Sequence, residues 1–398
     1  MMNKGFFLLF VICHLALSPS LLRAQQKKFL PFYRFTFGEG VSLPSKGDFF
    51  ASQDIGSQIG SVVKPLDRLQ IFGLYDLTYE GPGLMRSEGR LFTERAMRHS
   101  FMLEPSVEAP FVGTVRLKGF GIKENRRSGT NEIWGKGLYD YQATGFSFGI
   151  DKEFFGFRFS PAWRFTKMIF PNYTDLLREF QSGGLNAELA GGLMNQNVQA
   201  ISLGISRKPF RAGASLSAQK YKKEKVVSSG GTYLNENQKD ETTEFTADFD
   251  ARLWRISLVP NGAYRMKRSN QNYLRFAYFG DTNPTFIAKN YDYNEMSLGA
   301  RLYLHVTKTK ALFGSMSLND RIYPNRAPRN TDGVYALGEK QKTTWGAWGG
   351  GLQWKVSDYS TWNLAYNMVY SKSNMKYERF IPYNYTGHLV GLYLTVAP

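Results

Sequence analysis

The most constraining feature of this sequence is an alternation of apolar and polar residues with a period of two. In Phe155–Lys167, one set of alternate positions is mostly aromatic, and the other carries small residues together with Arg158 and Arg164. The same pattern recurs in Thr243–Leu253, Asp292–Val306 and Asn384–Ala397. Successive side chains of a β-strand point to opposite faces. The chain is therefore predicted to be all-β, and each strand has one apolar and one polar face.

The connections between the predicted strands alternate between short and long. Short turns fall at Lys64–Asp67, Ser106–Pro110, Asp151–Phe154, Lys208–Phe210, Leu253–Arg255, Val306–Lys310 and Val356–Ser360. Long polar segments fall near 44–54, 80–94, 124–137, 170–197, 223–239, 269–290, 324–340 and 374–384. A soluble sandwich has no reason to keep its short turns at one end, whereas this arrangement is typical of a closed antiparallel transmembrane β-barrel.

The segments predict about sixteen strands, an even number that places both termini at the same end of the barrel. An alternative count remains open, because Pro31–Leu43 and Ile55–Val63 are weaker strand candidates. If residues 25–64 formed a plug, the strands from Leu69 onward would make a barrel of about fourteen strands, which also closes.

The N-terminus has the pattern of a removable signal peptide. Lys4 precedes the apolar run Phe6–Leu17, and Ala24 ends a candidate cleavage site. We therefore predict a signal peptide over 1–24 and a single barrel domain over 25–398. The only cysteine, Cys13, lies inside the signal peptide. No later apolar run approaches the length of a membrane-spanning helix, so a membrane protein of this sequence must cross with strands.

The formal charge of +17 would suit nucleic acid, but the cations are scattered and the chain is expected to be exported, so no nucleic acid is predicted as a partner. Aromatic residues are frequent, at 15%. One group flanks the short turns: Phe111, Phe154, Phe155, Phe210, Trp254, Trp354, Tyr359 and Trp362. Aromatic girdles at the two membrane interfaces explain this placement better than strand propensity alone.

The signal peptide, the alternating strands, the connection lengths and the aromatic flanks together resemble the bacterial outer-membrane β-barrel class, in a porin-like form. The resemblance covers nearly the whole mature chain and names no single family. It implies an outer-membrane location, contact with outer-membrane lipid including lipopolysaccharide, and insertion by the barrel assembly machinery. The final residues Leu392–Pro398 depart from the pattern, because well-known porins end in phenylalanine.

Catalysis, a metal site and a cofactor are not predicted. None of His99, His305 and His388 has a serine two residues away on its strand, as the hydrolases of this class require. Asp248 and Asp250 could activate a water molecule, but a paired Asp–His is missing, and partnership with neighbouring arginines is the simpler interpretation. We therefore do not expect an enzyme.

The polar face of the strands is expected to line the lumen with mixed charge. Its predicted residues are Arg34, Asp76, Arg98, Glu104, Arg116, Lys118, Arg158, Arg164, Asp248, Asp250, Arg252, Glu295 and Arg301. A polar interior holds water, and the surplus of arginine suggests a mild preference for anionic solutes. An internal lattice of salt bridges that stiffens the wall is an equally good interpretation.

The segment Pro171–Gln196 is unusually apolar for an external loop. Its candidate constriction residues are Leu176, Leu177, Phe180, Leu185, Leu189 and Leu193. We expect it either to fold into the mouth of the barrel or to pack on the outer rim.

Cations also collect where strands meet the long loops, at the level of phosphorylated lipid headgroups. The candidate headgroup contacts are Arg126, Arg127, Lys222, Lys223, Lys267 and Arg268, with Arg321, Arg326 and Arg329 in the same region. Solvated loop charges are the alternative.

The function expected first is a channel for passive diffusion of small polar solutes, with a mild preference for anionic ones. A plugged barrel that transports hydrophobic compounds and a closed barrel that acts as a scaffold or adhesin remain as alternatives. No oligomeric state is predicted.

Overall fold

The computed structural model describes residues 29–46, 50–82, 95–127, 134–173, 192–275, 284–378 and 382–397. Its strands are β1 (Phe29–Pro44), β2 (Phe50–Leu66), β3 (Leu69–Pro82), β4 (Arg95–Ala109), β5 (Gly113–Arg127), β6 (Tyr141–Phe154), β7 (Phe157–Ile169), β8 (Gln196–Arg207), β9 (Phe210–Val227), β10 (Tyr233–Phe249), β11 (Ala251–Leu253), β12 (Ile256–Ser269), β13 (Tyr273–Arg275), β14 (Thr285–Ile287), β15 (Tyr293–His305), β16 (Lys310–Tyr323), β17 (Gln341–Lys355), β18 (Ser360–Ser373) and β19 (Tyr385–Val396). Within these residues, no helix has the length and apolarity needed to cross a membrane.

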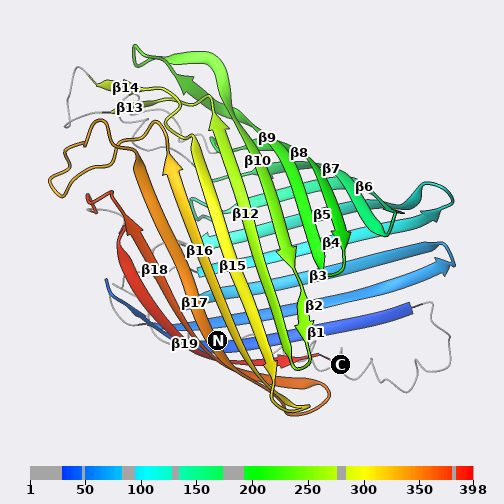
Figure 1. Ribbon diagram of the computed structural model, residues 1–398. Coiled ribbons are helices and arrows are strands. Elements are labelled where there is room, and N and C mark those ends of the chain that lie inside the picture. Colours follow the sequence, from blue (N-terminus) through cyan, green and yellow to red (C-terminus); the bar gives the residue numbers. More distant parts are fainter. Residues whose placement is uncertain are drawn as a thin grey trace.

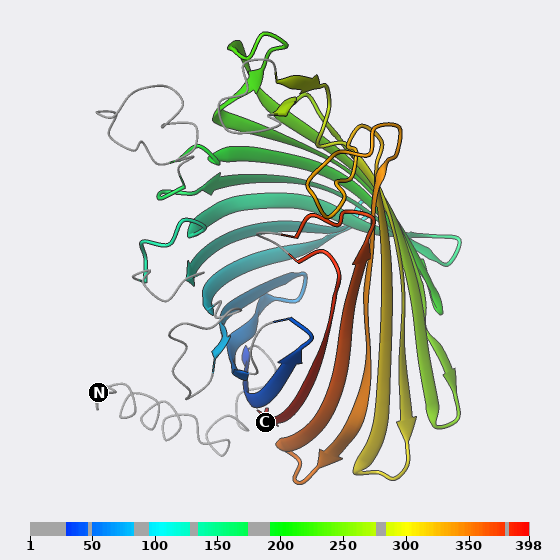
Figure 2. The same cartoon turned by 90° about the vertical axis from the view of Figure 1, so that its left-hand side faces the viewer.

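Antiparallel pairing of sequence neighbours builds one sheet, and the sheet closes because β1 also pairs with β19. This closing register runs from Phe35 opposite Val396 to Pro44 opposite Gly387, and Figures 1 and 2 show the two strands side by side. The sheet contains 17 strands, of which the short β11 continues β10 along the same partner, β12. The barrel wall therefore has sixteen strands, as the sequence predicts. The alternative with fourteen strands and a plug is wrong, because β1 and β2 are paired in the wall.

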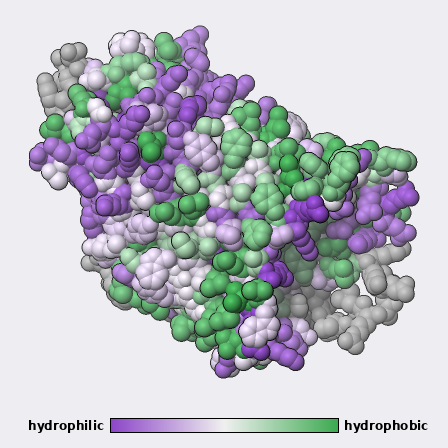
Figure 3. Space-filling model, in the orientation of Figure 1, coloured by the Kyte–Doolittle hydropathy of each residue, from purple (hydrophilic) through white to green (hydrophobic). Residues whose placement is uncertain are grey.

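Cross-strand partners share a face, so the register sorts every strand into two sides. On one side, large apolar side chains are exposed all round the wall, such as Phe101 at 56%, Ile201 at 63% and Leu216 at 55%. Figure 3 shows hydrophobic and neutral side chains over the strands, with hydrophilic ones gathered at the upper left around the long connections. Such a belt is unfavourable in water and favourable against lipid. This side is therefore the outer face of a membrane barrel.

The short turns lie together at one end of the barrel, toward the lower right of Figure 1, and the long connections lie at the other. Aromatic side chains at three of these turns are almost fully exposed: Phe111 at 94%, Phe155 at 97% and Trp254 at 86%. Each has a positive φ, of 67°, 51° and 51° respectively, a conformation that non-glycine residues rarely adopt. Exposed rings at one level of the wall are what a membrane–water interface favours.

The segment 223–239 differs from its prediction as a loop, because β9 and β10 continue through most of it. Tyr233 pairs with Val227 and Asn237 with Lys225, with shifts of register between the pairs. The Asn237 amide bridges this irregularity by donating to the carbonyls of Tyr221 and Lys222, at 3.1 and 3.0 Å. Polar side chains do not prevent pairing where backbone hydrogen bonds continue, so the hairpin extends beyond the neighbouring strands.

Candidate functional site: the lumen and its outer mouth

The inner face of the barrel lacks a packed apolar core. In the described part of the chain, the buried apolar residues are Ala143, Tyr221, Val226, Ala311, Ala365 and Met375. Many inward positions of β8, β9, β10, β15, β16 and β18 carry small or polar residues. Among them are Ser202, Ser215, Ser217, Thr246, Ser297, Ser315, Ser317 and Asn367. An interior of this kind cannot exclude water, since water hydrogen-bonds to its hydroxyl and amide groups.

The register places the predicted lumen residues, apart from Asp250, on the inner face. These are Arg34, Asp76, Arg98, Glu104, Arg116, Lys118, Arg158, Arg164, Asp248, Arg252, Glu295 and Arg301. Asp250 lies at the break between β10 and β11, where its backbone N–H donates to the carbonyl of Pro209 at 2.8 Å and its carboxylate accepts from Arg252 Nε at 3.4 Å. Asp248 accepts from Arg211 Nε at 2.6 Å, so both carboxylates have arginine partners.

Four charged side chains form a ladder across the inner face of β10, β12, β15 and β16. Arg265 donates to Glu244 at 2.9 Å and to Glu295 Oε1 at 3.3 Å. Arg321 donates from Nε to the other oxygen of Glu295 at 2.7 Å. Glu295 is only 5% exposed, and arginines compensate its charge from both sides. We call Glu244, Arg265, Glu295 and Arg321 the charged ladder; it links four successive strands.

Two further buried carboxylates, Asp151 and Asp240, also have cationic or hydrogen-bonding partners. Asp151, 5% exposed, accepts from Arg116 Nη2 at 2.8 Å and from Arg158 Nη2 at 2.6 Å. Asp240, 1% exposed, accepts from Ser269 Oγ at 2.6 Å and pairs with Lys267 Nζ at 2.8 Å. Buried charges need such partners, because an isolated one would lose its hydration without compensation.

A second set of inner-face cations has no such partner. Within the described residues, no carboxylate lies within ion-pair distance of Arg34, Lys118, Arg164 or Arg301. Arg34, Arg164 and Arg301 are exposed, and they come from β1, β7 and β15, on different parts of the wall. The inner face therefore contains both of the arrangements that the sequence left open, a salt-bridge lattice and unpaired positive charge.

The candidate headgroup contacts divide between the two faces. Arg126 and Lys267 differ from the prediction, because the register turns them inward, where they pair with Glu124 and Asp240. The strand register and not the level in the membrane determines that the side chains of Arg126 and Lys267 point inward. The outward register positions include Arg127 and Arg268, while Lys222 and Lys223 are exposed on the extended part of β9.

The candidate constriction residues Leu176, Leu177, Phe180, Leu185 and Leu189 lie outside the described residues. Leu193 is described: it is half-buried, and its backbone N–H donates to the carbonyl of Tyr173 at 3.4 Å.

The three described histidines, His99, His305 and His388, lie on three different strands, β4, β15 and β19. His99 and His388 lie at outward register positions, where each shares a hydrogen bond with a tyrosine hydroxyl, Tyr75 at 2.7 Å and Tyr366 at 2.8 Å. His305 lies on the inner face. Among the described residues, no group of three His, Cys, Asp or Glu side chains is placed to hold a metal ion.

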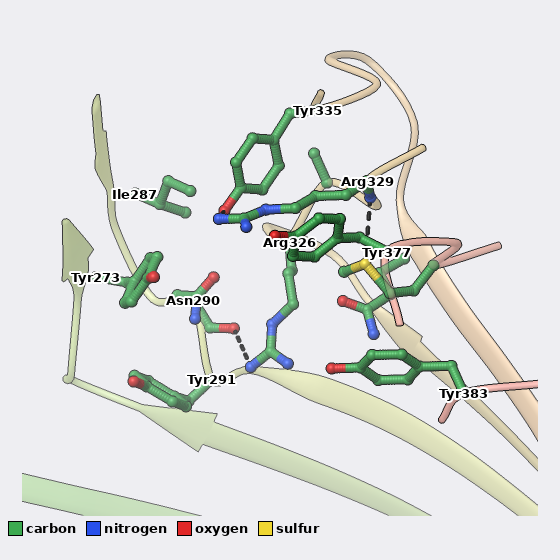
Figure 4. A pocket seen from close by; sticks show the side chains of 12 residues that line it. Tyr273, Ile287, Asn290, Tyr291, Arg326, Arg329, Tyr335, Tyr377 and Tyr383 are labelled. Atoms are coloured by element: carbon green, nitrogen blue, oxygen red, sulfur yellow. Dashed lines mark hydrogen bonds between the residues drawn. The ribbon is translucent and has the colours of Figure 1, made fainter. Parts of the chain in front are cut away.

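A pocket of about 370 Å³ lies at the outer end of the barrel, between the β13–β14 hairpin and the connections 324–340 and 374–384. Its walls are rich in tyrosine and arginine, and Figure 4 shows Arg326 reaching into the space between Tyr291 and Tyr383. No carboxylate is among the described residues that line it. We call this the Arg–Tyr pocket.

The arginines of the Arg–Tyr pocket stack on tyrosine rings. The guanidinium carbons of Arg275 and Arg329 lie 3.2 and 4.1 Å from the ring centroid of Tyr335. That of Arg326 lies 4.1 Å from the ring of Tyr323, and its Nη2 donates to the carbonyl of Asn290 at 3.3 Å (Figure 4). Stacking on a ring face leaves the N–H donors at the edge of the guanidinium available to other acceptors.

Side-chain and backbone contacts connect the pocket to the charged ladder. Tyr323, at the outer end of β16, accepts from Arg321 Nη1 at 3.2 Å, and Gln341 opposite it lines the pocket. Arg326 and Arg329, which are expected from the sequence at the level of the lipid headgroups, line this pocket instead, and the sequence pattern does not predict the pocket. The available signal was the recurrence of tyrosine beside arginine in three successive long connections, with few acids between them.

A closed wall of sixteen strands with an apolar outer face, aromatic residues at the turns and a charged, polar interior defines a transmembrane β-barrel of the bacterial outer-membrane type.

No family model matches the sequence, and no curated protein matches it. Among solved structures, the chain is similar to an anion-selective porin from Comamonas acidovorans, with 13% identity, a TM-score of 0.45, and coverage of 93% of this chain and 100% of that one. It is also similar to OmpF of Salmonella typhi, in a complex with daunomycin (11% identity, TM-score 0.45, 92% and 97% covered), and to the trimer form of OmpT, an outer membrane protein of Vibrio cholerae (9%, 0.44, 94% and 100%). With TM-scores below 0.5, these similarities leave the function to be argued from this chain's own residues.

Proposed function

We propose that the protein is a water-filled channel for passive diffusion of small polar solutes across the outer membrane, with a preference for anions. The observation that carries this proposal is the inner face, where small and polar side chains stand in place of an apolar core. Barrels of about 16–18 strands are wide enough to leave an aqueous channel when their interior is not filled.

The preference for anions is supported by the distribution of charge. Arginines of the charged ladder are neutralised by Glu244 and Glu295 and contribute little net field. Arg34, Arg164 and Arg301 have no such neutralisation among the described residues, so their charge acts on ions in the lumen. The Arg–Tyr pocket adds positive charge at the outer mouth.

The alternative of a plugged barrel for hydrophobic compounds required the N-terminal segment as its plug, but β1 and β2 belong to the wall. A closed barrel that acts through its loops is the competing function that conductance distinguishes from ours.

The test is a planar-bilayer recording with the purified full chain. We expect stepwise conductance in KCl and, under a KCl gradient, a reversal potential whose sign shows that chloride passes more readily than potassium. Protein unfolded by heat before reconstitution is the control for detergent artefacts. Absence of current steps from the folded protein would contradict the channel, and cation preference would contradict the anionic part.

Contact with outer-membrane lipid is part of the same proposal. Arg127 and Arg268 lie at outward positions near the ends of β5 and β12 that face the long connections. That level coincides with phosphorylated headgroups, which attract arginine. Insertion by the barrel assembly machinery remains a prediction.

A further inference from the structure

We propose that the Arg–Tyr pocket at the outer mouth binds a hydroxylated organic anion of the sugar-acid class, before it enters the lumen. This inference rests on the proposed channel function, because it names the solute that the channel would admit. Its volume of about 370 Å³ lies at the lower end of the range of roughly 300–1,000 Å³ that is usual for small-molecule sites.

The charge of the pocket selects an anion. Arg326 and Arg329 line it, and Arg275, only 7% exposed, lies directly behind Tyr335. Within the described residues, none of the three has a carboxylate partner. The two arginines that line the cavity have no counter-charge and repel each other, and an anion between them removes that repulsion.

The unused hydrogen-bonding groups define what the anion must carry. Nε of Arg326 is buried and has no acceptor in the structure. The Oε1 atom of Gln341, a residue only 2% exposed, is buried and has no donor. A guanidinium group donates hydrogen bonds and pairs well with carboxylate oxygens, whereas the Gln341 oxygen accepts a hydrogen bond from an N–H or O–H group. A ligand that combines a carboxylate with a hydroxyl satisfies both groups.

The tyrosines define the shape of the ligand. Tyr273, Tyr291, Tyr377 and Tyr383 surround the cavity with rings and hydroxyls (Figure 4). Burial raises the pKa of Tyr273, although the neighbouring arginines act to lower it, so its phenol remains protonated at neutral pH. Rings offer flat apolar surface and phenols offer donors, a combination that fits a compact ring with hydroxyls on its rim. A pyranose carboxylate has this chemistry, and inorganic anions do not.

The experiment is titration calorimetry of the full chain in detergent, with D-glucuronate as the probe. D-Glucose, acetate and inorganic phosphate are the comparison probes, because glucose lacks the charge, acetate lacks the hydroxyls, and phosphate lacks a carboxylate on a ring. We expect glucuronate to bind at least about tenfold more tightly than any of the three. Equal affinity for acetate would overturn the requirement for hydroxyls, equal affinity for phosphate would overturn the requirement for a ring carboxylate, and equal affinity for glucose would overturn the requirement for charge.

Variants place the binding in the pocket. Arg326→Gln and Arg329→Gln are each expected to weaken glucuronate binding about tenfold, since each removes a charge-assisted hydrogen bond. Arg164→Gln, an arginine of the lumen outside the pocket, is the matched control and should leave the affinity unchanged. Retained affinity in both pocket variants would overturn the assignment.

Two further measurements separate failure of the pocket from failure of the channel or of folding. The heat-modifiable gel migration of the pocket variants should equal that of the wild type, which shows that their barrels are intact. If no variant and no wild type conducts, the channel proposal fails, but glucuronate binding still decides the fate of the pocket. Arg326→Lys keeps the charge and loses the planar donors, so an affinity between those of wild type and Arg326→Gln is expected.

Discussion

The charged ladder and the Arg–Tyr pocket use the same residue type to opposite effect. In the ladder, Arg265 and Arg321 share Glu295 between them, and the three side chains are fixed to neighbouring strands. In the pocket, Arg326 and Arg329 stack on tyrosine rings and face a cavity without a carboxylate. The first arrangement stiffens the wall and the second presents charge to a solute. The number of arginines in a lumen therefore says little about its field until their partners are known.

The ladder should be sensitive to loss of its central acid. We expect Glu295→Gln to lower the free energy of unfolding by about 3 kcal/mol, because two arginines at a nearly buried site lose the charge they share. Urea unfolding in lipid vesicles, followed by tryptophan fluorescence, measures this change. Asp76→Asn, which alters an inner-face carboxylate without an ion pair in the described structure, should change stability by less than about 0.5 kcal/mol. Equal losses from both variants would show that the ladder is not special.

The unpaired arginines should show the reverse pattern. We expect the double variant Arg164→Gln, Arg301→Gln to shift the reversal potential toward cations and to change the stability by less than about 0.5 kcal/mol, since no ion pair is broken. Bilayer recordings under a KCl gradient measure the shift. Lys310→Gln is the matched control, because Lys310 lies over Trp354 on the outer face. A shift of the same size from that control would mean that the charge of the whole wall, not the inner face, sets the selectivity.

A surface pair at the outer rim should give the smallest effect. Lys46 and Glu378 join the connections that follow β1 and β18. Burial acts to raise the pKa of Glu378, but hydrogen bonds from Lys46, from Asn384 and from the backbone of Tyr383 outweigh it and lower the pKa to about 2, from an ordinary value of 4.5. A lowered pKa in the folded state means that the stabilisation is complete above about pH 4.5 and is lost as the pH falls through about 2.

Amide exchange of Tyr383 and Asn384 reports this pair, because both N–H groups donate to Glu378 Oε1, at 3.0 and 2.6 Å. Relative to a strand amide such as that of Leu392, we expect no change in their protection between pH 5 and pH 8. Glu378→Ala should speed their exchange about fivefold, as loss of a hydrogen bond worth about 1 kcal/mol implies. Protection that falls already near pH 5 would show that the carboxylate titrates at its ordinary pKa.

The strands of the barrel wall can be predicted from the local alternation of the sequence, whereas the Arg–Tyr pocket cannot. Alternation assigns Arg158, Arg164 and Arg301 to one face from the sequence alone, because each lies inside a long regular strand. The same reasoning turned Lys267 the wrong way, since it weighed closeness to a loop and not the parity of the strand. The Arg–Tyr pocket was beyond reach for a different reason. Its walls come from three connections far apart in the chain, and which loops meet depends on strand order and tilt.

The pairing of the first strand with the last has a consequence for biogenesis. Until Val396 lies opposite Phe35, the sheet has two unpaired edge strands. The backbone N–H and C=O groups of these edges have no hydrogen-bond partner in hydrocarbon. A chain that stops short of β19 is thus not a slightly smaller pore but an open sheet. An unmet polar backbone is unfavourable in hydrocarbon, so the wall can close only when β19 is present.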